Sequence, residues 1–223
     1  MMRSAVVLVV GICVLVFSTF SVFASSGRSV PRSLVPQMFL YEEKPDMAQP
    51  TTVPGSVAWS IDMRTDAKGR SDPVILQAHI AVPTRHLTAV LTLERNADPS
   101  VSASHLIELS FQIAPGFKGG GIYSLQRMSM KATESDRGDA LIAVPAKVTD
   151  NLYMLALNDL PEARARNLEL LERQWIDLPI FYQDGKRALL TLEKGADGDR
   201  IFNQAKQAWA ANDLAGTAAG NAQ

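Results

Sequence analysis

The stretch that decides the fold is residues 105–113, HLIELSFQI. Apolar residues occupy every second position from Ile107 to Ile113, and polar residues such as Glu108 lie between them. A period of two with one polar face is typical of an antiparallel strand that turns one side to a core. The stretch therefore predicts an antiparallel sheet with one buried face.

The same alternation extends outward from this stretch. Residues 86–94 (HLTAVLTLE) and 55–61 (GSVAWSI) repeat it before residue 105. Turn-forming clusters such as NADPS and SDRGD separate the apolar runs. Five more strands are predicted at residues 39–43, 74–82, 124–131, 141–148 and 152–157.

The pattern changes after residue 157. Asp159 is placed to cap a helix, and Glu162 follows three residues later, which is the spacing of a capping box. A second helix is predicted at residues 199–211, where apolar residues recur at helical spacing up to Trp209. The chain is thus expected to be mainly β (α+β), an antiparallel sandwich or curved sheet with two amphipathic helices near the C-terminus.

A hairpin is predicted between the two helices, at residues 175–194. Asp184 and Gly185 suit a tight type I′ turn, which needs positive φ at both central residues. Pro179 has no N–H to donate to a ladder, so its strand is expected at a sheet edge.

Before the strands lies an apolar segment without charge, residues 5–24. About 20 such residues span a bilayer core as a helix. Arg3 and the ending Val22-Phe23-Ala24 also suit a signal peptide cleaved before Ser25. The two alternatives stay open: an inner-membrane anchor facing the periplasm, or a periplasmic protein after cleavage following Ala24.

The sequence divides into four parts on this reading. Residues 1–24 are the signal peptide or transmembrane anchor, and residues 25–37, rich in Ser, Arg and Pro, are a linker. Residues 38–211 form the β-rich globular domain, and residues 212–223 a flexible tail. Cys13 is the only cysteine, so the exported part has no disulfide.

Charge and composition exclude one class of function. The 223 residues carry 22 basic and 23 acidic side chains, a formal net charge of −1. No basic stripe interleaved with aromatic residues is present, so a nucleic-acid partner is not expected.

A glycine-rich stretch, GFKGGGIYSL at residues 116–125, raises the question of a phosphate loop. In a Walker-type loop the lysine follows the last glycine and a helix begins there. Here Lys118 precedes the glycine run, and the chain continues with strand alternation. The stretch therefore predicts a turn between strands.

Catalytic and metal-binding patterns are not found. His79, His86 and His105 do not have metal-site spacing, although strands could still bring them together. Ser104 and His105 would point to opposite faces of a strand. The closest acidic pairs, Glu42 with Glu43 and Asp136 with Asp139, do not suggest a cleft either. No residue is assigned a catalytic, cofactor-binding or metal-binding role, and no cofactor is expected.

Several longer stretches resemble an uncharacterised family of alphaproteobacterial envelope proteins: LYEEKPD, GSVAWSI, ASHLIELSFQIAPGFKGGGI, PAKVTDNLYMLALND and RARNLELLERQWIDLPIFYQDGKRALLTLEKG. The resemblance covers residues 38 to 210. It implies an N-terminal hydrophobic segment, a short linker and one exported domain, and it implies no reaction.

Three functions follow as hypotheses. The first is a non-enzymatic domain that binds another envelope protein, through an exposed edge at residues 176–183. The second is a periplasmic module that holds a small-molecule or lipid ligand between sheet and helices. The third is an enzyme whose site uses His79, His86 or His105. The oligomeric state is left open.

Overall fold

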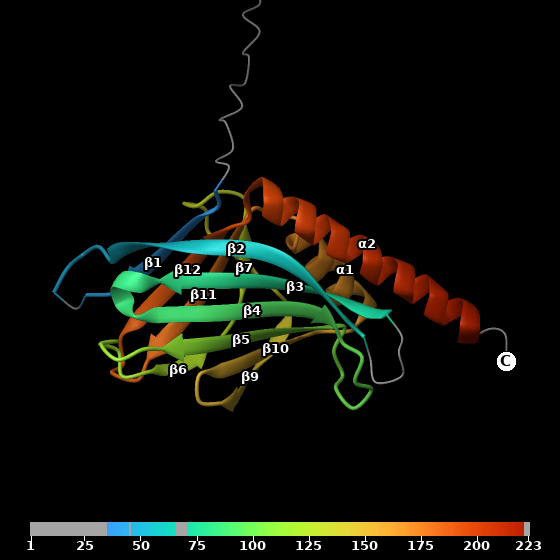
Figure 1. Ribbon diagram of the computed structural model, residues 1–223, viewed down its shortest axis with the longest axis horizontal. Coiled ribbons are helices and arrows are strands. Elements are labelled where there is room, and N and C mark those ends of the chain that lie inside the picture. The colour runs from blue at the N-terminus through green and yellow to red at the C-terminus, as the bar shows by residue number, and fades with distance from the viewer. Residues whose placement is uncertain (1–34, 45, 66–70, 221–223) are drawn as a thin grey trace, which may run out of the picture. The chain divides into compact units, whose positions relative to one another are not determined.

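The structure is a computed structural model that describes residues 35–44, 46–65 and 71–220. Most of the described chain forms a curled antiparallel sheet, a half-barrel, with two helices (Figure 1). The prediction of a mainly β fold with a curved sheet is confirmed. The predicted signal peptide or anchor lies outside the described residues, as does most of the linker. None of the described helices is long and apolar enough to cross a membrane.

The sheet order is β8-β7-β11-β12-β1-β2-β3-β4-β5-β10-β9, and β6 also pairs with β11. All pairs are antiparallel. The strands are β1 (Gln37–Glu42), β2 (Thr51–Thr65), β3 (Ser71–Val82), β4 (Leu87–Arg95), β5 (His105–Ile113), β6 (Ile122–Leu125), β7 (Ser129–Lys131), β8 (Asp139–Ala140), β9 (Ala143–Thr149), β10 (Leu152–Leu157), β11 (Trp175–Tyr182) and β12 (Arg187–Glu193).

The alternation seen in the sequence becomes the inner face of the curl. In β5, Ile107, Leu109 and Phe111 are buried, and the polar residues between them lie on the outer face. The other long strands contribute to the same apolar core. Its largest residues leave almost no surface to solvent; Leu91 and Leu109, for example, are 0% exposed. The inside of the half-barrel is filled by side chains.

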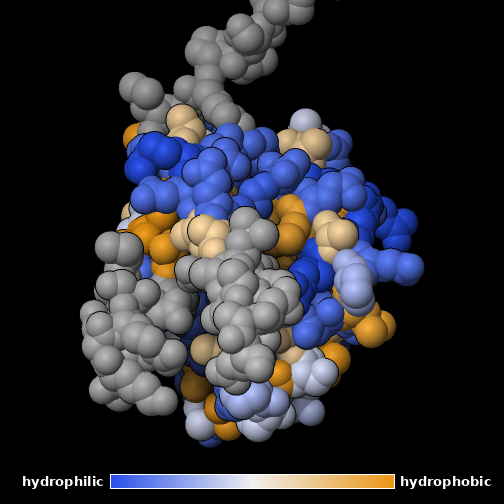
Figure 2. All heavy atoms as spheres, turned by 90° about the vertical axis from the view of Figure 1, so that its right-hand side faces the viewer, coloured by the Kyte–Doolittle hydropathy of each residue, from blue (hydrophilic) through white to orange (hydrophobic). Residues whose placement is uncertain are grey.

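Helix α2 (Gly195–Gly220) packs against β2 and β3. Phe202 meets the ring of Trp59 edge to face at 5.2 Å between ring centroids. The indole N–H of Trp209 donates to the carbonyl of Val74, near the start of β3, at 3.0 Å. The helix begins earlier and ends later than residues 199–211. In the part of the helix whose burial is described, polar residues such as Asn203, Gln204 and Gln207 are exposed. The upper part of the surface in Figure 2 is mostly hydrophilic.

Helix α1 spans Pro161–Leu170, but the cap predicted for it is wrong. The N-cap residue is Leu160, whose apolar side chain cannot accept a capping hydrogen bond. The carboxylate of Asp159 pairs with Arg164 instead. The side chain of Asn158 accepts the N–H of Leu160 at 2.9 Å. Proline at the first helical position removes one N–H that would otherwise need a partner, so the helix starts without a capping box.

Pro179 does not mark a sheet edge, and this prediction is corrected. Strand β11 pairs with β12 on one side and with β7 and β6 on the other. Trp175–Asp177 pair with β7, and residues 180–182 pair with β6, so Pro179 lies opposite the break between these two short strands. The missing N–H is tolerated because no ladder bond is required there. Residues 124–131 were predicted as one strand, but they fall into two short strands, β6 and β7, with the break opposite Pro179 between them.

The hairpin between β11 and β12 is confirmed, but its turn type is not. The N–H of Tyr182 donates to the carbonyl of Lys186 at 2.9 Å, which leaves a three-residue loop. Only Gly185 in this loop has positive φ, at 86°. This is the geometry of a type I turn followed by a left-handed glycine, rather than type I′.

The two ends of the curl meet at one place through side chains. The hydroxyl of Tyr153 in β10 donates to the carbonyl of Ile122 in β6 at 2.8 Å, and Tyr153 is 1% exposed. The side chain of Asn151, in the turn before β10, accepts the N–H of Ile122 at 3.4 Å. In the described chain no backbone ladder joins β6 to β9 or β10, so the ladder of the half-barrel does not close at this seam, although β6 and β9 lie close together.

Replacing Tyr153 by Phe is expected to destabilise the fold by about 1–3 kcal/mol, because a buried carbonyl loses its donor. Equilibrium unfolding in urea measures the change. The matched control is Tyr123→Phe, because Tyr123 is 65% exposed. Equal stability of the two variants would contradict the assigned role of the seam hydrogen bond.

Candidate functional site

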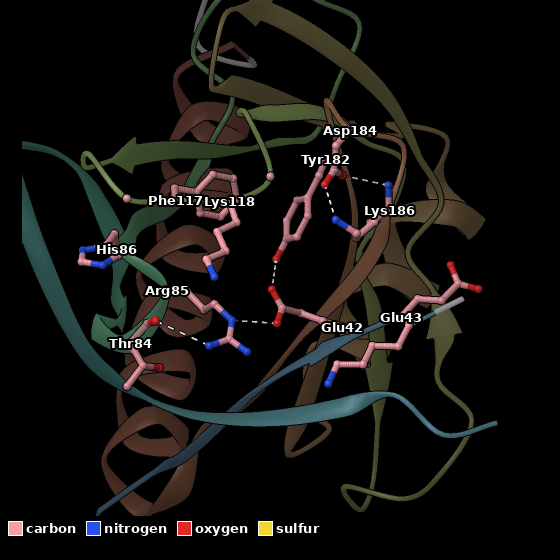
Figure 3. Close-up of a pocket in the computed structure, with 13 residues that line it drawn as sticks. Glu42, Glu43, Thr84, Arg85, His86, Phe117, Lys118, Tyr182, Asp184 and Lys186 are labelled. Carbon is pink, nitrogen blue, oxygen red and sulfur yellow. Dashed lines mark hydrogen bonds and ion pairs between the residues drawn. The ribbon is translucent and has the colours of Figure 1, made fainter. Parts of the chain in front are cut away.

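A pocket of about 390 Å³ opens at one end of the half-barrel. It is formed by the end of β1, the β3–β4 turn, the loop after β5 and the β11–β12 turn. These are the strand ends opposite to those that α2 covers. The pocket is shown in Figure 3. Four separate turns converge there, so the site exists only in the folded sheet.

Glu42 is the centre of the polar contacts in this pocket. Its Oε2 accepts a hydrogen bond from Nε of Arg85 at 2.7 Å, which is also an ion pair. Its Oε1 accepts the hydroxyl of Tyr182 at 3.1 Å (Figure 3). The last residue of β1 is thus joined to the β3–β4 turn and to β11 through one carboxylate.

Tyr182 is held as a neutral phenol. Burial raises the pKa of its hydroxyl well above the usual range, and the nearby charge of Glu42 and the hydrogen bond to it raise the pKa further. The ring packs edge to face on Phe117, with ring centroids 5.0 Å apart. Tyr182 therefore acts in this pocket as a hydrogen-bond donor and an apolar wall.

The glycine-rich stretch proves to be the turn that leads from β5 to β6. A Cβ on Gly119 would lie 2.6 Å from the ring of Phe117 and 2.8 Å from that of Tyr182. Gly120 and Gly121 have positive φ, 74° and 149°. No helix begins after these glycines, so the loop lacks the helix N-terminus of a Walker-type site. The glycines allow the loop to lie against the β11–β12 turn.

The three histidines lie apart. His79 is exposed in β3, and His105 is buried at the start of β5 against the ring of Trp209, at 4.7 Å between centroids. His86 adopts a left-handed conformation, φ 54°, after the short 3-10 helix of Pro83–Arg85, and it lines the pocket. Within the described residues, no group of three His, Cys, Asp or Glu side chains is placed to hold a metal ion.

The other residues considered for catalysis have structural partners. The hydroxyl of Ser104 is near the carbonyls of Leu157 and Asn158, at 3.4 and 3.3 Å. Glu43 pairs with Arg187, away from Glu42. The carboxylates of Asp136 and Asp139 bind different donors: Asp136 accepts the N–H of Thr133, and Asp139 pairs with Arg166 and Arg173.

A second surface lies on β9, one of the two terminal strands of the sheet. Within the part of the chain that the structure describes, β9 pairs only with β10. Its residues 144–149 are exposed. Three exposed apolar side chains lie on or just before β9, Ile142 (43% exposed), Val144 (66%) and Val148 (49%), and a fourth, Tyr123 (65%), belongs to the nearby strand β6. These four residues are called the β9 surface below.

Sequence reasoning missed both features. Arg85 and Tyr182 come from distant turns, and the only sequence signal was the set of turn residues at each strand end. The β9 surface was missed because residues 141–148 read as an ordinary strand with a buried face. The exposed edge predicted at residues 176–183 is wrong, since β11 is paired on both sides.

Comparison of the chain with protein-family models, with curated proteins and with solved structures gives no match. The likeness to alphaproteobacterial envelope proteins stays a prediction from the sequence.

Replacing Tyr182 by Phe tests the state of the pocket phenol. Tyrosines of an unfolded chain ionise near pH 10. Because the folded pKa of Tyr182 is raised, the stability that this creates is present below about pH 10 and is lost as the pH rises further. Between pH 8 and pH 11, wild type is expected to lose about 1 kcal/mol more unfolding free energy than Tyr182→Phe. Urea unfolding at both pH values measures this, and equal losses would contradict it.

Proposed function

We propose that this protein is an exported, non-enzymatic component of the cell envelope that binds an extended segment of another envelope protein along β9. The observation that carries the proposal is an unpaired terminal strand with exposed apolar side chains. Such an edge offers N–H and C=O groups in the spacing that an added strand needs.

The β9 surface favours an apolar strand as partner. Val144 lies opposite Ala156 of β10 in the register, and Ala156 lies opposite Leu106 of β5. All three share the outer face of the sheet, because the alternate residues Leu155 and Leu157 are buried inside. An added strand would place its apolar side chains beside Val144 and extend this row.

Two residues of β9 restrict which strands can bind. Pro145 has no N–H for a ladder, and Lys147 carries a charge that is paired with Asp150 at 2.9 Å. Proline and lysine are common devices that protect an exposed edge from unspecific pairing. The partner is therefore expected to match a particular register, so β9 discriminates among extended segments.

Export is part of the same proposal. Residues 5–24, with no charged side chain, serve as an inner-membrane anchor or as a signal peptide cleaved after Ala24. The linker of residues 25–37 then separates the domain from the bilayer or begins the mature chain. The absence of cysteine after Cys13 agrees with a domain held together by its core alone.

The alternatives are less well supported. A lipid held between sheet and helices would need interior space, and that region is filled by the apolar core. A site built from the three histidines would need them to converge, and they do not.

The experiment that tests the β9 interaction is site-specific photo-crosslinking in the native host. A photoreactive residue at Ala146, in the middle of β9, is expected to capture one partner, and mass spectrometry should place the crosslink in an extended apolar segment. The same probe at Met47, which is 58% exposed on the loop between β1 and β2, is the control.

The double variant Val144→Asp/Val148→Asp is expected to lower that crosslink at least about tenfold, because two charges would have to be buried beside the added strand. Its own stability should change by less than about 0.5 kcal/mol, since both positions are exposed. Val144→Ile is the conservative control and should retain the partner. Retention of the partner by the Asp variant, or a crosslink to a second copy of this chain, would contradict the proposal.

A further inference from the structure

We propose that the pocket of Arg85, Lys118 and Tyr182 binds a small organic anion, a carboxylate or phosphate group attached to a compact apolar or aromatic body. This site is separate from the β9 surface and does not depend on its function. Four observations carry the inference: the unbalanced charge of the pocket, the direction of its donors, its apolar walls and its size.

The charge of the pocket favours an anion. Its acidic side chains each have a cationic partner: Glu42 pairs with Arg85, Asp184 with Lys186, and Glu43 with Arg187, which lies outside the pocket. Two further lysines line it, Lys44 and Lys118. Within the described residues neither has an acidic partner. The pocket therefore holds two ammonium groups whose charge nothing in it balances.

The donors point into the same space. Figure 3 shows the side chain of Lys118 extending from the glycine-rich loop toward Arg85. Arg85 uses Nε for Glu42 and one terminal nitrogen for a long contact of 3.5 Å to the carbonyl of Thr84. A guanidinium has five N–H donors, so others remain for a ligand. An ammonium and a guanidinium side by side suit the oxygens of a carboxylate or phosphate.

The negative charge of Glu42 would repel an anion in the pocket, but this charge is offset by its ion pair with Arg85. One oxygen of the carboxylate accepts a hydrogen bond from Nε of Arg85, and the other accepts one from the Tyr182 hydroxyl. Both oxygens are thus occupied by donors. This arrangement fixes the guanidinium at the pocket and offsets the negative charge beside it.

The remaining walls accept an apolar body. The rings of Phe117, Tyr182 and His86 line the pocket. The imidazole of His86 is packed on Gly116, where a Cβ would lie 2.9 Å from Cδ2. A volume of about 390 Å³ lies at the small end of the range of ligand pockets, which begins at ~300 Å³. The volume of the pocket suits an anionic group attached to about one ring or a short aliphatic chain.

The probes for the test are phenyl phosphate and benzoate, with benzyl alcohol as the uncharged control. Titrations of the purified protein followed by amide NMR and by calorimetry are expected to show saturable binding of at least one anion, with shifts confined to the four turns of the pocket. Binding should weaken as salt increases, because the attraction is between charges.

The decisive variant is Lys118→Gln, which removes one unpaired charge from an exposed loop position. It is expected to weaken anion binding about 3- to 10-fold. Lys206→Gln is the matched control, because Lys206 lies on α2 and pairs with Glu172, outside the pocket. The double variant Glu42→Gln/Arg85→Gln keeps the charge balance of the pair and should weaken binding further by removing the guanidinium.

Three results would overturn the inference. One is the absence of saturable binding by both anions at millimolar concentration. Another is equal binding of benzyl alcohol and the anions. The third is the same affinity in Lys118→Gln and Lys206→Gln. A failure of photo-crosslinking at β9 would leave this inference unaffected, because the two sites share no residue.

Discussion

The whole structure depends on burying one apolar face of every long strand in a single core. A strand with alternating side chains has only one face to hide, and a flat sheet would leave that face in water. Curling the sheet brings the inner faces of β1 to β5 and β10 to β12 against one another, around residues such as Leu91, Leu109 and Leu178. Helix α2 then closes one end of the curl with Phe202 and Trp209. No disulfide is available to the described chain, so this burial has to hold the domain together.

The curl also explains where polar chemistry is found. A half-barrel has two ends, and α2 covers only one of them. At the other end the turns converge, and Glu42, Arg85 and Tyr182 come together although they are far apart in sequence. The same incomplete closure leaves β9 paired only with β10 among the described strands, although β6 lies close to it across the seam. Pocket and edge are thus two consequences of one architectural fact, a sheet that curls around its core without closing its ladder.

Short breaks in the hydrogen-bond ladder accommodate residues that cannot take part in it. The gap between β6 and β7 lies opposite Pro179, so a residue without an N–H fits inside a paired strand. Side chains take over where backbone pairing stops: Tyr153 bonds Ile122 across the seam, and the amide of Asn167 both donates to and accepts from the backbone of Ile142, at 3.0 and 2.8 Å. The Tyr153 hydroxyl thus supplies a donor to the carbonyl of a buried residue, and the Asn167 amide holds the backbone just before β9 in place.

The sequence by itself determined the fold class, most strand positions, the two helices and the reading of the glycine run as a turn, because side-chain period and turn chemistry are local properties. It did not determine which strands become neighbours. Pro179 showed that one ladder hydrogen bond would be missing. A position at the sheet edge and a position opposite a break in the partner strand both tolerate this loss, and only the tertiary pairing shows that Pro179 lies opposite a break. Asp159 had the chemistry of a cap, yet the chain placed Leu160 there. The pocket around Glu42 and the exposed side of β9 were likewise decided by the tertiary structure, since both arise from which strand ends meet and which edge stays unpaired.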